Sequence, residues 1–167
     1  MKRLLCGAAV AAALLLSATP SSAQVVNMTA TLTGAEETTA TPGVLGILTG
    51  AVGTATVSVD ATNQEVAVQL QLFNFATGTT AGHIHVGPRG VAGPVVLNFP
   101  VPTGQTGDLP LSFRLGPSAF VARPEIGINT MTDAIQSIVG GGAYVNIHSS
   151  QFPGGEIRGQ LTVVPQR

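Results

Sequence analysis

The chain has 167 residues with 7 basic and 8 acidic side chains, a formal net charge of −1, and 44% hydrophobic residues. This balance, with no basic stripe and no tryptophan, argues against a nucleic-acid-binding surface, which needs clustered lysine or arginine. The single cysteine, Cys6, leaves no disulfide framework.

The first 23 residues have the pattern of a secretory signal peptide. Lys2 and Arg3 precede an apolar run, and small residues at Ser21–Ala23 offer a cleavage site. The run is shorter than the roughly 20 residues that a membrane-spanning helix needs. We therefore expect a protein that is secreted or periplasmic, with no membrane span after signal removal and one domain over residues 24–167.

Alternating apolar and polar residues predict most of the secondary structure. In the run after Gln24, Met28 and Leu32 fall on one face and threonines on the other, which is typical of a half-buried strand. Gly- and Pro-rich turns separate about eight such strand candidates. They cover residues 25–34, 53–60, 65–73, 82–87, 94–99, 109–115, 143–150 and 156–164.

One segment has helical periodicity instead. Across 128–139, Met131, Ile135 and Ile138 recur at helical spacing, and three glycines from Gly140 end the run. Many short strands with one helical crossover near 130–139 predict an all-β fold, an antiparallel Greek-key β-sandwich or flattened barrel.

The three histidines of the chain lie in two of the predicted strands. Side chains alternate across a strand, so His83 and His85 share a face while Ile84 and Val86 point into the core. The same rule places further polar side chains on that outer face: Tyr144, Asn146, His148, Glu156, Arg158 and Gln160. We expect Glu156 to hydrogen-bond His148 or to pair with Arg158. Val163 should lie on the inner face of the last strand.

The segments "AGHIHVGPRGVAGPVV" and "YVNIHSSQFPGGEIRGQL" resemble the CHRD domain, a module named after the repeats of chordin. "LTGAEETTA" followed by "GTATVSVD" is similar to the opening of that family, although "AEETTA" departs from its Glu-x-Pro-Pro style. The resemblance covers nearly all of the mature chain. It implies a secreted β-sandwich without an established catalytic activity, working through interaction with an extracellular or envelope protein partner.

"GHIHVG" also resembles the His-x-His strand that supplies copper ligands in copper/zinc superoxide dismutases. The chain lacks the zinc loop, the disulfide and the fourth histidine of those enzymes, so we do not expect dismutase activity.

Two interpretations of the histidines remain open. Imidazoles at i and i+2 of a strand, with a third from a neighbouring strand, suit Zn(II) or Cu(II), which gives a metal site of His83, His85 and His148. Glu156 would then fix a histidine tautomer from outside the ligand set. Alternatively the histidines belong to a polar network with Asn146, Glu156, Arg158 and loop carbonyls.

Enzymatic candidates are weaker. No GxSxG motif occurs, and Ser149 and Ser150 are only sequence neighbours of His148. The acidic pair Glu36 and Glu37 is interpreted as solvated surface. The sequence thus predicts a non-enzymatic binding or structural module, with a copper- or zinc-binding envelope protein as the alternative.

Overall fold

The computed structural model describes residues 25–38 and 46–165. The predicted signal peptide at residues 1–23 lies outside this part of the chain, as do the last two residues. The strands are β1 (Val25–Thr33), β2 (Val52–Asp60), β3 (Glu65–Phe75), β4 (Thr79–Val86), β5 (Val95–Phe99), β6 (Gly107–Leu115), β7 (Ala143–Ser149), β8 (Ile157–Gln160) and β9 (Thr162–Val163). The helices are α1 (Met131–Val139) and three short 3-10 turns, η1 (Gly34–Glu36), η2 (Pro117–Ala119) and η3 (Pro124–Ile126).

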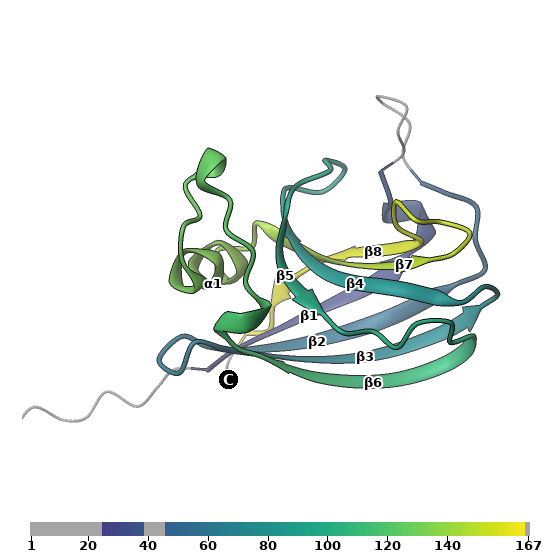
Figure 1. Ribbon diagram of the computed structural model, residues 1–167, viewed down its shortest axis with the longest axis horizontal. Helices are drawn as coiled ribbons and strands as arrows, with labels where there is room; N and C mark the ends of the chain where they lie inside the picture. The colour runs from purple at the N-terminus through teal and green to yellow at the C-terminus, as the bar shows by residue number, and fades with distance from the viewer. Residues whose placement is uncertain (1–24, 39–45, 166–167) are drawn as a thin grey trace, which may run out of the picture.

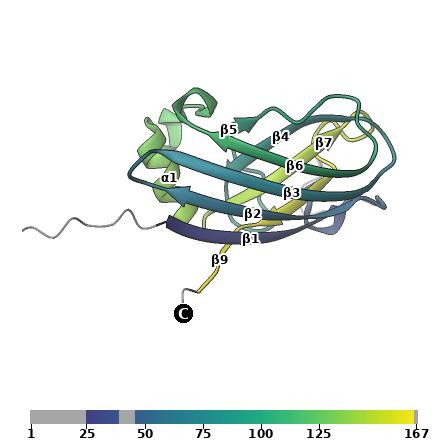
Figure 2. The ribbon, with the colours of Figure 1, turned by 90° about the horizontal axis from the view of Figure 1, so that it is seen from below.

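The strands form one antiparallel sheet that curls into a nearly closed, flattened barrel (Figure 1). The strand order is β5-β4-β7-β8-β1-β2-β3-β6, and β9 pairs with β1. β1, β2, β3 and β6 make one layer and β4, β5, β7 and β8 the other, and Figure 2 shows the first layer in front of the second. Both β3 to β4 and β6 to β7 connect strands that are not neighbours, which confirms the predicted Greek-key antiparallel class.

The core follows from the alternation read in the sequence. Along β1, Met28 and Leu32 are fully buried while Thr29 and Thr31 are exposed. The same alternation holds in β2 and β3, which pair in register with β1, and their inward valines and leucines fill the space between the two layers. On β4, Ile84 is fully buried and Val86 packs against the same core.

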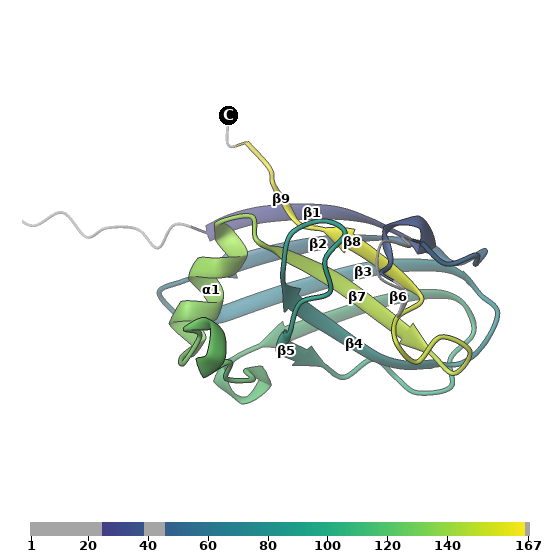
Figure 3. The same cartoon turned by 90° about the horizontal axis from the view of Figure 1, so that it is seen from above.

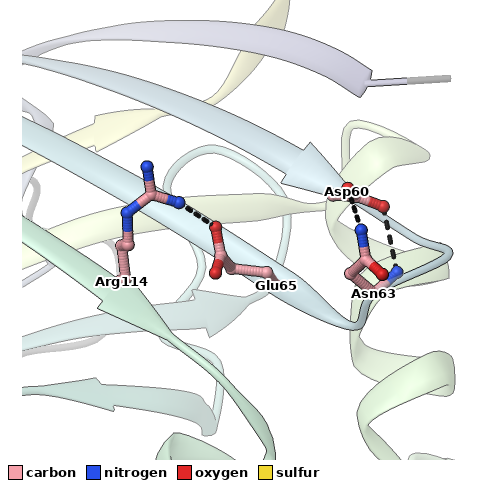
Figure 4. A network of polar contacts seen from close by, with 4 residues as sticks. All are labelled: Asp60, Asn63, Glu65 and Arg114. Carbon is pink, nitrogen blue, oxygen red and sulfur yellow. Dashed lines mark hydrogen bonds and ion pairs between the residues drawn. The ribbon is translucent and has the colours of Figure 1, made fainter. Parts of the chain in front are cut away.

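The β2–β3 hairpin is closed by its own polar residues (Figure 4). Asp60 accepts hydrogen bonds from the backbone and side-chain nitrogens of Asn63 at 3.0 and 2.8 Å, which lower the pKa of this carboxyl. On the exposed surface, Arg114 of the neighbouring strand β6 forms an ion pair with Glu65, the first residue of β3. This pair lies on the layer opposite to β4 and β7.

Helix α1 lies at one end of the barrel (Figure 3). It begins after Thr130, whose hydroxyl accepts from the backbone nitrogen of Asp133, and the Asp133 carboxylate accepts in return from the Thr130 backbone. Met131, Ile135 and Ile138 are buried, as their spacing predicts. Among the described residues, no helix has the length and apolar character that crossing a membrane requires.

The end of the chain departs from the prediction. Strand pairing is interrupted at Leu161, so the predicted strand over 156–164 becomes β8 and the two-residue β9. Leu161 is buried, but Val163 is 48% exposed. The inward placement of Val163 was therefore wrong, because β9 runs past the covered part of the sheet and pairs with β1 alone.

Candidate metal centre on the outer face of β4, β7 and β8

The polar face predicted from alternation exists, and the register aligns its residues in rows across three strands. His83 lies opposite Asn146, which lies opposite Arg158. The next row begins at His85 and continues through Tyr144 to Gln160. His148 is two residues from Asn146 and therefore on the same face.

The three histidines meet on this face. The Nδ1 atom of His83 lies 3.0 Å from Nε2 of His148, and their ring centroids are 4.7 Å apart. The ring of His85 lies 5.5 Å from that of His83 and 6.4 Å from that of His148. One ring nitrogen from each histidine lies within 4.8 Å of the other two.

Backbone carbonyls fix the protonation of two of the rings. Nδ1 of His85 lies 2.8 Å from the carbonyl oxygen of Gly93, and Nδ1 of His148 lies 2.9 Å from that of Pro153. A carbonyl only accepts, so both Nδ1 atoms carry a proton, and both Nε2 atoms of the neutral rings carry a lone pair. Nε2 of His148 accepts from Nδ1 of His83. Nε2 of His85 is buried and has no hydrogen-bond partner within the described chain.

The environment keeps the histidines neutral. Burial lowers the pKa of His83 and of His85 to about 4, and it also lowers the pKa of His148. Mutual repulsion among the rings adds to this effect at His83, and hydrogen bonding to the Gly93 carbonyl opposes it at His85. Neutral imidazole is the form that binds metal ions.

A stack of three side chains leads away from His85. Tyr144 lies parallel to the His85 ring, with centroids 4.8 Å apart and planes inclined by 9°. The guanidinium carbon of Arg158 lies 3.4 Å from the centre of the Tyr144 ring, within cation–π range. Arg158 is 1% exposed. Its two terminal nitrogens each donate at 2.9 Å, to the carbonyls of Val91 and Pro88.

The segment between β4 and β5 therefore covers this outer face. Gln160 donates to the carbonyl of Gly87 at 3.1 Å, and Arg89 forms an ion pair with Glu36 at the edge. At the other end, the backbone nitrogen of Gly93 donates to the Tyr144 hydroxyl at 2.9 Å. In Figure 3 this segment passes across β7 towards β8. The long loop closes over the polar face, and most of the face is buried.

The carboxylates do not occupy the predicted positions. Glu156 accepts a hydrogen bond from the Thr49 hydroxyl at 2.6 Å and bonds neither His148 nor Arg158. The prediction that Glu156 fixes a histidine tautomer was wrong, because carbonyls of Gly93 and Pro153 perform that role. Arg158 donates to loop carbonyls instead of forming a close ion pair with a carboxylate.

Glu37 was also misplaced by the sequence analysis. It is 1% exposed, whereas its neighbour Glu36 pairs with Arg89 at the surface. Burial raises the pKa of Glu37 to about 7, although a backbone hydrogen bond and the charge of Arg158 lower it in part. A Cβ added at Gly155 would lie 2.8 Å from both Glu37 Oε1 and Asn146 Oδ1, so this glycine lets the two side chains approach. The sequence carried no signal for this contact, since Glu37 precedes Asn146 by over a hundred residues.

The geometry of the three imidazoles suits a metal ion. Two ligands about 2.1 Å from one ion lie roughly 3.0 Å apart at a right angle and roughly 3.4 Å apart in a tetrahedron. The His83–His148 separation of 3.0 Å already lies at that distance. The limit of 4.8 Å over all pairs exceeds these separations by roughly 1.4 to 1.8 Å, so holding one ion requires the His85 ring to move closer to the other two. Ser149 is fully buried and accepts from the Phe152 backbone, so it offers no exposed nucleophile beside His148.

Comparison with known proteins gives one match. The family model described as the CHRD domain matches residues 28–161, which include all three histidines. Searches of curated proteins and of solved structures found no match.

Proposed function

The chain belongs to the CHRD domain family, and we propose that it is an exported, non-enzymatic module that binds one copper or zinc ion through His83, His85 and His148. CHRD domains occur in extracellular or secreted proteins. Export of this chain is inferred from its first 23 residues, which have the pattern of a signal peptide.

One observation carries the proposal: all three histidines of the chain converge, and one ring nitrogen of each lies within 4.8 Å of the other two. The Gly93 and Pro153 carbonyls hold the Nδ1 protons of His85 and His148. Histidines that ligate metals are commonly fixed by such a hydrogen bond from the non-ligating nitrogen. A metal ion would replace the proton shared between His83 and His148, and that proton would move to Nε2 of His83.

A second function is favoured by a different observation. The hydrogen bond between His83 and His148 satisfies both nitrogens without a metal. The cluster would then be a structural polar network beneath the β4–β5 segment, and the module would act through a protein partner.

Metal titration separates the two functions. The mature chain is titrated with Cu(II) and with Zn(II) by calorimetry, and we expect saturation at one ion per chain. His148→Ala should reduce the affinity at least tenfold. Thr80→Ala, an exposed position on the same strand as His83, is the matched control and should bind as the unmodified chain does. Absence of saturable binding of zinc, and of copper in either oxidation state, at micromolar metal would overturn the metal function and leave the polar network.

A further inference from the structure

The charges around the three histidines are unusual for a divalent-metal site. The hydrogen-bond partners of the rings in the described chain are neutral backbone carbonyls and another imidazole. Neither ion pair of the described residues includes a histidine, and the ligand cluster contains no carboxylate. Among the described residues, no carboxylate pairs with these rings to offset the positive charge of a bound ion, and the buried carboxyl of Glu37 interacts with Arg158 and Tyr144 instead.

Two cations act on the site instead. Arg158 is separated from His85 only by the Tyr144 ring, in steps of 3.4 and 4.8 Å between successive groups. Arg123 donates from Nε to the carbonyl of Val95 at 2.7 Å, and Val95 lies opposite His85 in the sheet. Arg158 thus approaches His85 from the side of β7, and Arg123 from the side of β5.

From this arrangement we propose that the three-histidine site selects monovalent copper, Cu(I), over Cu(II) and Zn(II). The inference rests on the proposed metal-binding function and assigns the ion. The site offers three neutral nitrogen donors in a largely buried position with two arginines nearby.

Charge favours the monovalent ion. The cost of transferring an ion from water into a low-dielectric site rises with the square of its charge, so a divalent ion loses more hydration free energy than Cu(I) does. Repulsion from a fixed cation doubles for a divalent ion. At about 10 Å and an effective dielectric constant near 20, one arginine weakens binding on the order of tenfold per unit of ion charge.

The number of available ligands also favours Cu(I). Zn(II) in proteins is almost always four-coordinate, and with three histidines it takes a water in the fourth position. The described chain provides no fourth His, Cys, Asp or Glu ligand in this cluster. Cu(I) is stable with three nitrogen ligands, so the histidines alone complete its coordination.

The test measures the affinity of the mature chain for each ion. Cu(I) is titrated without oxygen against a chromophoric Cu(I) chelator, and Cu(II) and Zn(II) are titrated against chelators of known affinity. We expect Cu(I) to bind at least tenfold more tightly than Cu(II) or Zn(II). The bound copper couple should then lie at least about 60 mV above aqueous copper, which is a tenfold ratio for one electron.

Two variants test the electrostatic origin. Arg158→Gln and Arg123→Gln should each raise the affinity for Cu(II) relative to Cu(I) on the order of tenfold, and lower the copper potential by about 60 mV. Arg114→Gln removes an arginine from the opposite layer, where it pairs with Glu65, and should leave the ratio unchanged (Figure 4). Arg158 is buried beneath the β4–β5 segment, and its variant could fail to fold for that reason. Arg123→Gln and the affinity ratio of the unmodified chain then test the selection without it.

The outcomes separate the two proposals. If none of the three ions binds, the metal-binding function fails and the selection falls with it. If Cu(II) or Zn(II) binds as tightly as Cu(I), metal binding stands and the Cu(I) selection is overturned. An unchanged ratio in both arginine variants also overturns the electrostatic selection.

Discussion

Gly93→Ala should disrupt the cluster of His83, His85 and His148 although residue 93 is not part of it. A Cβ at residue 93 would lie 1.8 Å from the carbonyl oxygen of Val86 and 2.7 Å from its carbon. Both atoms are backbone at the end of β4, so no side-chain rotation relieves the clash. The β4–β5 segment must lift at this point.

The magnitude follows from the bonds that lifting breaks. The Gly93 carbonyl accepts from His85 at 2.8 Å and from the Tyr144 hydroxyl at 3.3 Å, and the Gly93 nitrogen donates to that hydroxyl at 2.9 Å. At about 1 kcal/mol net for each hydrogen bond, their loss lowers the free energy of unfolding by about 3 kcal/mol. Urea denaturation of the metal-free chain, followed by circular dichroism, measures this difference.

A matched glycine controls for the added methyl group. Gly116 has a negative φ and nothing within 4 Å of an added Cβ, so Gly116→Ala should change stability by less than about 0.5 kcal/mol. Long-range proton–nitrogen NMR adds a local readout, since loss of the Gly93 bond releases His85 from the Nδ1–H tautomer. A Gly93→Ala chain that is as stable as the control, with the His85 tautomer unchanged, would refute the assigned role of this segment.

Two further predictions concern pH. The folded-state pKa values of His83 and His85 are about 4, below the ordinary 6.5, so their stabilising contribution is complete above pH 6.5 and is lost as pH falls towards 4. The free energy of unfolding of the metal-free chain should therefore fall by several kcal/mol over this window, and a flat profile would contradict the burial of neutral imidazoles. The pH dependence of stability that comes from Glu37 runs in the opposite direction. Its pKa is raised from 4.5 to about 7, so its ionisation destabilises the fold as pH rises through this range. Glu37→Gln should gain stability over the unmodified chain by up to about 3 kcal/mol between pH 4.5 and 7, measured by urea denaturation at each pH, and a gain independent of pH would place the carboxyl in solvent.

Much of the fold was predictable because its strands are half-buried. Where one face meets the core and the other meets water, as at Met28 and Thr29, alternation carries the signal directly. The signal failed at Val163, where alternation continues although pairing has been reduced to a two-residue edge. Burial of a strand depends on what lies above it, and the local pattern does not contain that information.

The histidine cluster was predictable to the extent that it depends on strand geometry. Alternation placed His83 and His85 together, and the pairing of β4 with β7 brought His148 to them. The groups that orient the histidines were not predictable in this way. They are the backbone carbonyls of Gly93 and Pro153. Every residue has a backbone carbonyl, so the residue types at these positions could not indicate this role.

Glu37 shows the same limit for a charged side chain. Two adjacent glutamates are alike in sequence, yet η1 turns Glu36 towards Arg89 and Glu37 into the protein. Its neighbours Asn146 and Gly155 come from β7 and the turn after it, over a hundred residues away. Only the closed barrel determines which of the two carboxyls is buried.

The buried charge of Arg158 connects the β4–β5 segment with the histidine cluster. Its guanidinium holds the β4–β5 segment through the carbonyls of Pro88 and Val91, and that segment positions the Gly93 carbonyl against His85. In the proposed copper site, the same charge would oppose a divalent ion. A neutral side chain of equal size could hold the segment only in part, because it lacks the paired donors of the guanidinium. The requirement to cover the histidines thus places a cation behind them, and this placement favours an ion of low charge.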